Sequence, residues 1–187
     1  RHPRFSLQLS PVNIELIYKS APLHDIGKIG IPDRILLKPG RLTPDEFQIM
    51  KTHAALGRRA IEQAEQQTGQ TAPFLQFAKE IAGMHHERWN GTGYPHGISG
   101  EAIPVSARLM AVADVYDALV STRAYKTPMT HSAACAAILR ERGSHFDPDV
   151  VDAFAAVSDE FNRIAMSTAD SSALAGATPA RITGATA

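Results

Sequence analysis

The sequence predicts an all-α domain, and two observations lead to this fold class. Apolar residues recur at spacings of three and four along most of the chain, which is the period of an α-helix packed by one face. No segment alternates apolar and polar residues over the length of a strand. With 187 residues and a hydrophobic fraction of 44%, the chain is long enough for one helical domain with a buried core.

Six helices are expected, and each follows a recognisable start signal. The first follows Ser10-Pro11, a capping serine and a proline suited to the first turn. The second has the strongest signal, because Thr43 can cap the helix and Glu46, three residues later, completes a capping box. The other helices are expected to begin at Pro73, at Pro104, at Thr130 (ending at Arg142 before Gly143) and at Asp147-Pro148, the last continuing through Phe161.

Apolar stripes predict which face of each helix is buried. The stripe of the first helix consists of Ile14, Ile17, Tyr18 and Ala21, and that of the second of Phe47, Met50, Ala54 and Ile61. Two segments rich in Gly and Pro, 27–41 and 89–103, interrupt the helices. Glycine lets the backbone approach a ligand closely, so both segments are expected to be loops with a functional role.

The ends of the chain differ in composition from its middle. Residues 1–9 are expected to be a truncated N-terminal remnant, because the chain opens without Met inside a basic, polar stretch. Residues 166–187 are rich in Ala, Ser, Thr and Gly and contain no aromatic residue, which predicts a disordered tail. The domain is therefore expected to span residues 10–165.

Composition argues against several classes of partner. Lys plus Arg and Asp plus Glu both number 19, so the formal net charge is zero and no global field attracts DNA. Cys135 is the single cysteine, which excludes an intrachain disulfide and fits a reducing compartment. No apolar run approaches the roughly 18 residues of a membrane span, and no signal-peptide pattern opens the chain. A cytoplasmic protein without a membrane partner is expected.

Candidate metal ligands occur as two adjacent pairs and two single residues. They are His24-Asp25, His53, His85-His86 and Asp114. Imidazole nitrogen and carboxylate oxygen together suit first-row divalent metals such as iron, manganese or zinc. Adjacent residues on a helix point about 100° apart, so a vicinal pair can address two metals or bridge them. Two metals can clamp the attacking and leaving oxygens of phosphoryl transfer.

Asp114 and three cations add to this pattern. Asp114 has apolar neighbours and is expected to face the core, where an unpaired carboxylate would need a compensating cation. Lys28, Arg123 and Lys126 could hold the nonbridging oxygens of a phosphodiester. The alternative for Arg123 and Lys126 is an ordinary role as charges at a helix C-terminus, which the helix dipole favours.

Several segments resemble signatures of the HD-GYP family of metal-dependent phosphohydrolases. Residues 24–28 (HDIGK) resemble the HD signature, and residues 85–95 (HHERWNGTGYP) resemble HHExxDGxGYP. Residues 112–119 (VADVYDAL) and 123–126 (RAYK) are similar to the VADxxDAL and RxYK segments of the family. The resemblance covers roughly residues 10 to 165 and implies an HD-domain helical bundle with a glycine-rich GYP loop.

The family implies hydrolysis of cyclic di-GMP, a bacterial second messenger, to linear pGpG, GMP or both. It implies two divalent metal ions, iron or manganese first, with zinc, nickel and magnesium as alternatives. The implied ligands are His24, Asp25, His53, His85, His86 and Asp114, with Asp25 as the bridge. Asp25 and Lys28 carry the implied catalytic role, and Lys28, Tyr94, Arg123 and Lys126 the implied substrate contacts. An N-terminal receiver domain and GGDEF-type proteins are the implied protein partners.

The chain departs from the family pattern at two points. The family has a further His ligand on a helix before the one that begins near Pro11, and this chain lacks that helix. Asn90 stands where the signature has Asp, which keeps the size and turn-forming ability but removes the charge. Two other functions therefore stay open: a catalytically inert sensor or adaptor that binds cyclic dinucleotide or a protein, and an HD phosphohydrolase for another nucleotide.

Overall fold

The computed structural model describes residues 3–69, 72–121 and 127–175. Within these residues the chain forms α-helices and short 3-10 helices (η) and no strand, which confirms the predicted all-α class. The elements are η1 (Pro3–Phe5), α1 (Pro11–Ser20), η2 (Ala21–Leu23), η3 (Ile26–Gly30), α2 (Asp33–Leu36), α3 (Pro44–Thr68), α4 (Pro73–Met84), η4 (Gly100–Ala102), α5 (Val105–Val120), α6 (His131–Arg140), α7 (Pro148–Ala156) and α8 (Ser158–Ala175). None of the described helices combines the length and the apolar character that a bilayer span requires.

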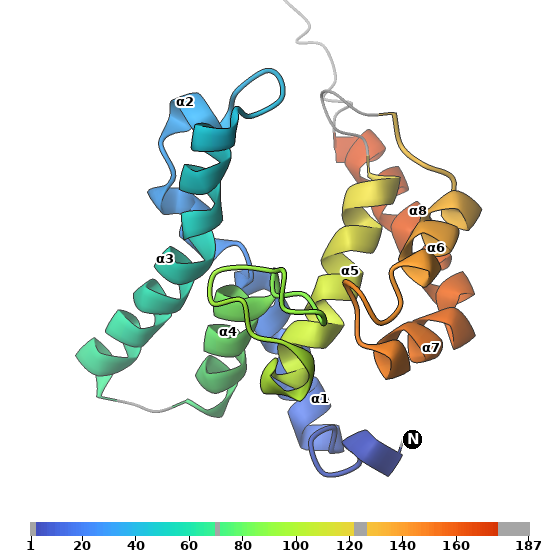
Figure 1. The fold of residues 1–187 in the computed structure, drawn as a ribbon, viewed down its shortest axis with the longest axis horizontal. Helices are drawn as coiled ribbons and strands as arrows, with labels where there is room; N and C mark the ends of the chain where they lie inside the picture. Colours follow the sequence, from blue (N-terminus) through green and yellow to red (C-terminus); the bar gives the residue numbers. More distant parts are fainter. Residues whose placement is uncertain (1–2, 70–71, 122–126, 176–187) are drawn as a thin grey trace, which may run out of the picture.

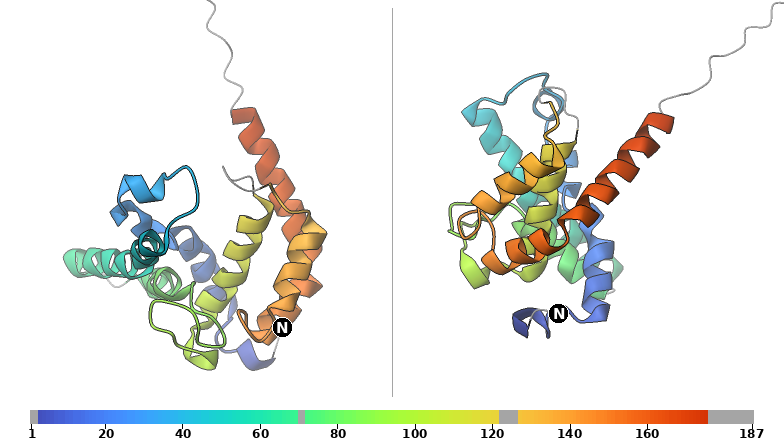
Figure 2. Two further views of the ribbon diagram at one scale, coloured as in Figure 1. Left: turned by 45° about the horizontal axis from the view of Figure 1, so that its top comes forward. Right: turned by 90° about the vertical axis from the view of Figure 1, so that its right-hand side faces the viewer.

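The helices form two groups with the glycine-rich loop, residues 89–103, between them (Figure 1). The first group is α1 to α4, with α1 packed against α4, and the second is α5 to α8. Helix α5 joins the groups, because it packs against α4 on one side and against α6 and α7 on the other. The largest core cluster lies in the second group and includes Val112, Tyr116, Ile138, Val151 and Phe154. Helix α8 extends away from the body at its far end (Figure 2).

The start signals in the sequence correspond to real caps. The Ser10 hydroxyl accepts a hydrogen bond from the Asn13 amide, and the Thr130 hydroxyl accepts one from the Ala133 amide. Thr43 and Glu46 form both hydrogen bonds of the predicted capping box at the start of α3. At the start of α5, Pro104 is the residue before the helix and not its first member.

The helices beyond residue 140 differ from the prediction. Helix α6 ends at Arg140, two residues before the expected end at Arg142. The single helix expected from Asp147 to Phe161 is instead two helices, α7 and α8, separated by Val157. The apolar spacing runs through the break because Phe154 and Phe161 both pack on the same core cluster. Helix α8 also continues to Ala175, into the segment predicted to be a disordered tail. Alanine and methionine in that segment favour helix, a propensity that a composition argument overlooks.

The segment 27–41 is not simply a loop, because it contains most of η3 and all of α2. Both are too short to show an apolar period in the sequence. Burial within the expected stripes was also partly wrong: Ile14, Tyr18 and Phe47 are 53%, 78% and 44% exposed. The backbones of η3 and α3 meet where Gly27 lies against Gly57, and a Cβ on Gly27 would lie 2.0 Å from the His53 carbonyl oxygen. This approach places η3 directly beside the part of α3 that carries His53.

Candidate metal centre

Four parts of the chain bring the predicted ligands together. His24 and Asp25 lie between η2 and η3, His53 lies on α3, His85 and His86 follow α4, and Asp114 lies on α5. One ligand atom each from Asp25, His53, His85 and His86 lies within 4.8 Å of the others. Four of the six predicted ligands, far apart in the sequence, therefore converge on one volume.

The two carboxylate oxygens of Asp25 face different histidines. Oδ1 lies 3.4 Å from His53 Nε2, and Oδ2 lies 3.3 Å from His24 Nε2. His24 Nε2 in turn lies 4.0 Å from Asp114 Oδ1. Asp25 thus stands between one group that contains His53, His85 and His86 and another that contains His24 and Asp114. A carboxylate with this placement can bridge two cations.

Backbone hydrogen bonds fix the orientation of three imidazole rings. The Nδ1 atoms of His24, His53 and His85 lie 2.9, 2.7 and 2.8 Å from the carbonyl oxygens of Ala21, Met50 and Ile81. A carbonyl oxygen only accepts, so each Nδ1 carries a proton, and in the neutral rings of His53 and His85 Nε2 presents its lone pair. The Nε2 atoms of His53 and His85 are buried and have no hydrogen-bond partner among the described atoms. Two buried, inward-facing lone pairs without partners fit metal coordination.

The pKa shifts favour neutral imidazoles at three of the ligands. Burial lowers the pKa of His53, and it lowers the pKa of His85 to about 4 and that of His86 to about 2. The hydrogen bond with Asp25 raises the pKa of His24. A histidine must be neutral to bind a metal, so burial keeps His53, His85 and His86 ready to coordinate at neutral pH without losing a proton first.

Lys28 completes the charged part of the cluster. Its ammonium donates a hydrogen bond to Asp25 Oδ2 at 2.5 Å, and its side chain is 40% exposed. Burial alone would raise the pKa of Asp25, but hydrogen bonds with His24 and Lys28 outweigh burial and hold that pKa well below its usual range. Asp114 is 23% exposed and not enclosed in the core as expected, since the cluster is open to solvent on this side.

A family model described as "HD domain" matches residues 5–150 of the chain. The chain belongs to the HD-domain family. The chain is 59% identical over 162 residues to a "Probable cyclic di-GMP phosphodiesterase" of Vibrio cholerae serotype O1, covering 87% of this chain and 37% of that protein. It is 47% identical to a "Cyclic di-GMP phosphodiesterase" of Thermotoga maritima, covering 83% of this chain and 41% of that protein. It is 40% identical to the "3'3'-cGAMP-specific phosphodiesterase 2" of Vibrio cholerae, and this match covers 87% of this chain and 30% of that protein.

The glycine-rich loop of this HD domain lies against the candidate metal ligands. The Tyr94 ring stacks on the His86 ring, with centroids 4.7 Å apart and planes at 27°, and the Tyr94 amide donates to the His86 carbonyl. The loop thus folds back on the residues that follow His86. Gly93 allows this close approach, because a Cβ there would lie 2.3 Å from the Arg88 backbone nitrogen. The predicted substrate residue Tyr94 is therefore in contact with the cluster. Arg123 and Lys126 lie outside the described residues.

Glu87 holds the loop from inside the HD domain, a role that the sequence prediction missed. Its side chain is 2% exposed, and Oε1 accepts a hydrogen bond from the His96 amide at 2.7 Å. Oε2 has no hydrogen-bond partner among the described atoms. The sequence signal for this role was the position of Glu87 directly after His85-His86. A glutamate is rarely buried unless it has a partner, so its burial in the structure indicates a function.

Glu87→Ala is expected to destabilise the metal-free domain by about 1–3 kcal/mol, because the His96 amide then loses its acceptor inside the protein. Glu87→Gln keeps an acceptor oxygen and is expected to lose less than half as much. Urea denaturation of the metal-free protein measures both, and Trp89, the single tryptophan, reports loop structure by its fluorescence. Equal stability of Glu87→Ala and wild type would contradict this role.

Asn90 forms a local turn within the loop. Its Oδ1 accepts hydrogen bonds from the Thr92 amide at 3.0 Å and from the Thr92 hydroxyl at 2.7 Å. An aspartate at this position would accept the same two hydrogen bonds, so the substitution preserves the local geometry. The change that separates this HD domain from its family signature leaves the turn intact.

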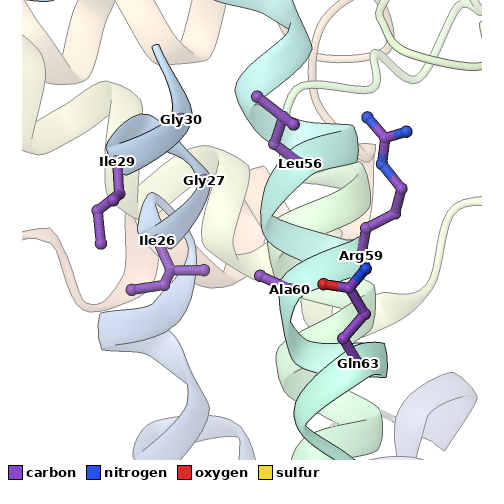
Figure 3. Close-up of a pocket in the computed structure, with 8 residues that line it drawn as sticks. All are labelled: Ile26, Gly27, Ile29, Gly30, Leu56, Arg59, Ala60 and Gln63. Carbon is purple, nitrogen blue, oxygen red and sulfur yellow. The ribbon is translucent and has the colours of Figure 1, made fainter.

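A separate hollow of 440 Å³ lies between η3 and α3 (Figure 3). Ile26 and Ile29 contribute from η3, and Leu56, Arg59 and Gln63 contribute from α3. None of the predicted ligands lines this hollow. The candidate ligand cluster and the hollow are therefore distinct features of the domain.

Proposed function

We propose that this HD domain is a metal-dependent phosphodiesterase that hydrolyses cyclic di-GMP to linear pGpG, GMP or both. The observation that carries the proposal is the convergence of Asp25, His53, His85 and His86, with two buried Nε2 atoms that have no hydrogen-bond partner in the described part of the chain. Relatives that are 59% and 47% identical bear the name of cyclic di-GMP phosphodiesterase. The chain spans 37% and 41% of their length, so the activity of the whole protein forms part of the proposal.

The donor set fits two divalent ions, for which iron and manganese are the proposed identities. His53, His85, His86 and one oxygen of Asp25 would hold one ion, and His24, Asp114 and the other oxygen of Asp25 would hold the second. Bound there, the ions supply Lewis-acid activation of water and of the phosphoryl oxygens. The second group has fewer protein ligands among the described residues than the first.

The side chains of the domain perform the remaining tasks. Lys28 would donate to a nonbridging phosphate oxygen, and its hydrogen bond to Asp25 supports this role by holding the ammonium beside the candidate ligands. The backbone carbonyls behind His24, His53 and His85 keep the rings in one orientation, so little reorganisation is needed when substrate binds. Tyr94 covers the His86 ring and separates it from bulk water on that face. Arg123 and Lys126 are proposed as further phosphate contacts.

The inert sensor is the second candidate, and two features of the sequence favoured it, Asn90 and the missing N-terminal ligand helix. The hydrogen bonds of Asn90 with Thr92 weaken the first argument, because its side chain accepts both of them within a turn, a role that needs no negative charge. We also propose a receiver domain N-terminal to this domain and GGDEF-type proteins as partners.

Hydrolysis of purified cyclic di-GMP tests the proposed function. We expect the domain loaded with manganese or, without oxygen, with iron to convert the substrate to pGpG or GMP, as followed by chromatography. The chelator-treated protein is the control and should show no turnover until metal is restored. Binding of cyclic di-GMP without hydrolysis by any metal-loaded sample would favour the sensor, and turnover of 3'3'-cGAMP in preference to cyclic di-GMP would assign another nucleotide.

A further inference from the structure

Phe47 and Lys51 lie one turn apart on α3, beside the tyrosine that covers the metal ligands. The Phe47 and Tyr94 rings have centroids 6.3 Å apart with planes at 83°. The Lys51 ammonium lies 5.0 Å from the Phe47 centroid and 5.5 Å from the Tyr94 centroid. Residues four apart on a helix share one face, so Phe47 and Lys51 present a ring and a cation together.

These side chains extend the metal centre toward the surface of the protein. Tyr94 stacks on His86 and lies 6.5 Å from the His53 ring, so it joins the ligands to Phe47. Phe47 is 44% exposed, although an apolar ring of this size is normally buried. An exposed ring that adjoins a phosphate-binding centre offers a stacking surface for a nucleotide base.

Lys51 supplies a hydrogen-bond donor at this surface. Among the described residues no carboxylate forms an ion pair with it, and its ammonium lies against the two rings. Guanine presents two neighbouring acceptors, O6 and N7, on the edge away from its sugar, whereas adenine presents one acceptor and an amino donor. A lysine ammonium has donors only and therefore matches guanine.

We infer that Phe47, Lys51 and Tyr94 form a base subsite that binds a guanine of the substrate, with Phe47 providing the stacking surface and Lys51 donating to O6 or N7. This inference rests on the proposed function, because it takes the scissile phosphate to lie at the metal cluster. It makes Phe47 and Lys51 specificity-determining residues. Neither residue lies among the metal ligands, so both can be changed while metal content is measured independently.

Steady-state hydrolysis and direct binding of cyclic di-GMP test the subsite in the 187-residue chain. Phe47→Ala is expected to raise KM, and the Kd from calorimetry, about tenfold with kcat and metal content retained. Phe47→Leu keeps apolar bulk without a ring and should remain weak, whereas Phe47→Tyr should restore most of the affinity. Ile49→Ala, which removes an apolar side chain that is 37% exposed on the same helix, is the matched control.

Lys51→Met keeps the length of the side chain and removes the donor. We expect it to reduce the preference for cyclic di-GMP over cyclic di-AMP about fivefold or more, because the matched hydrogen bond to guanine is lost. Unchanged preference in Lys51→Met, or an unchanged Kd in Phe47→Ala, would overturn the inference. Wild-type protein that binds cyclic di-GMP without turning it over would refute the proposed function, while the Kd values would still decide the subsite. Wild-type protein that does not bind cyclic di-GMP would refute both.

Discussion

Asp25→Asn is expected to abolish hydrolysis, with a loss of at least about 1,000-fold in kcat/KM, together with metal binding. The amide is the same size as the carboxylate, so the fold should survive. One amide oxygen, however, cannot replace two anionic oxygens that face His53 and His24 at 3.4 and 3.3 Å. The neutral amide also lacks the charge that offsets two divalent ions.

Metal analysis of the purified variant and a hydrolysis time course measure the two losses together. Asp117→Asn is the matched control, because Asp117 is exposed on α5 and accepts a hydrogen bond from Ser121 outside the cluster. It should retain both metal and turnover. Full turnover by a metal-free Asp25→Asn protein would remove the basis for a metal-dependent reaction. His86→Ala should resemble Asp25→Asn, because His86 belongs to the same group of four ligand atoms.

The fold could be predicted where structure depends on residues that are close together in the sequence, as at the helix caps. The caps at Ser10, Thr43 and Thr130 depend on a side chain and an amide three positions away, and all three are present in the structure. The break at Val157 could not be predicted, because Phe154 and Phe161 keep a helical spacing across it while packing on one core. The spacing of apolar residues indicates which face of a helix is buried. It does not show whether one helix ends and another begins along a different axis.

The candidate ligands could be selected from the sequence because their residue types are rare in combination and because they resemble a family signature. Their mutual distances depend on the packing of α3, α4 and α5, which no spacing in the sequence specifies. Phe47 was assigned to a buried stripe because its neighbours Met50 and Ala54 follow the core period. Its 44% exposure follows from its place at the edge of that stripe, beside the glycine-rich loop. The spacing of apolar residues therefore does not distinguish a buried core residue from an apolar residue exposed beside a site.

Gly27→Ala is expected to destabilise the protein by more than about 3 kcal/mol and to prevent metal binding. A Cβ at this position would lie 2.0 Å from the His53 carbonyl oxygen and 2.4 Å from the Gly57 nitrogen. Both are backbone atoms of α3 and cannot move aside as a flexible side chain can. Relief would require η3 to separate from α3, which would carry Asp25 away from His53.

Gly30→Ala is the control, because it lies in the same η3 segment and its Cβ would meet only the tip of the Leu56 side chain, at 3.0 Å. We expect it to stay within about 1 kcal/mol of wild type, since a small shift of Leu56 accommodates the methyl group and alanine restricts the unfolded chain. Urea denaturation of the metal-free proteins gives both free energies, and metal titration shows whether Asp25 still faces His53. If Gly27→Ala unfolded at the same urea concentration as Gly30→Ala and bound metal equally well, the close approach of η3 and α3 would not be what positions the cluster.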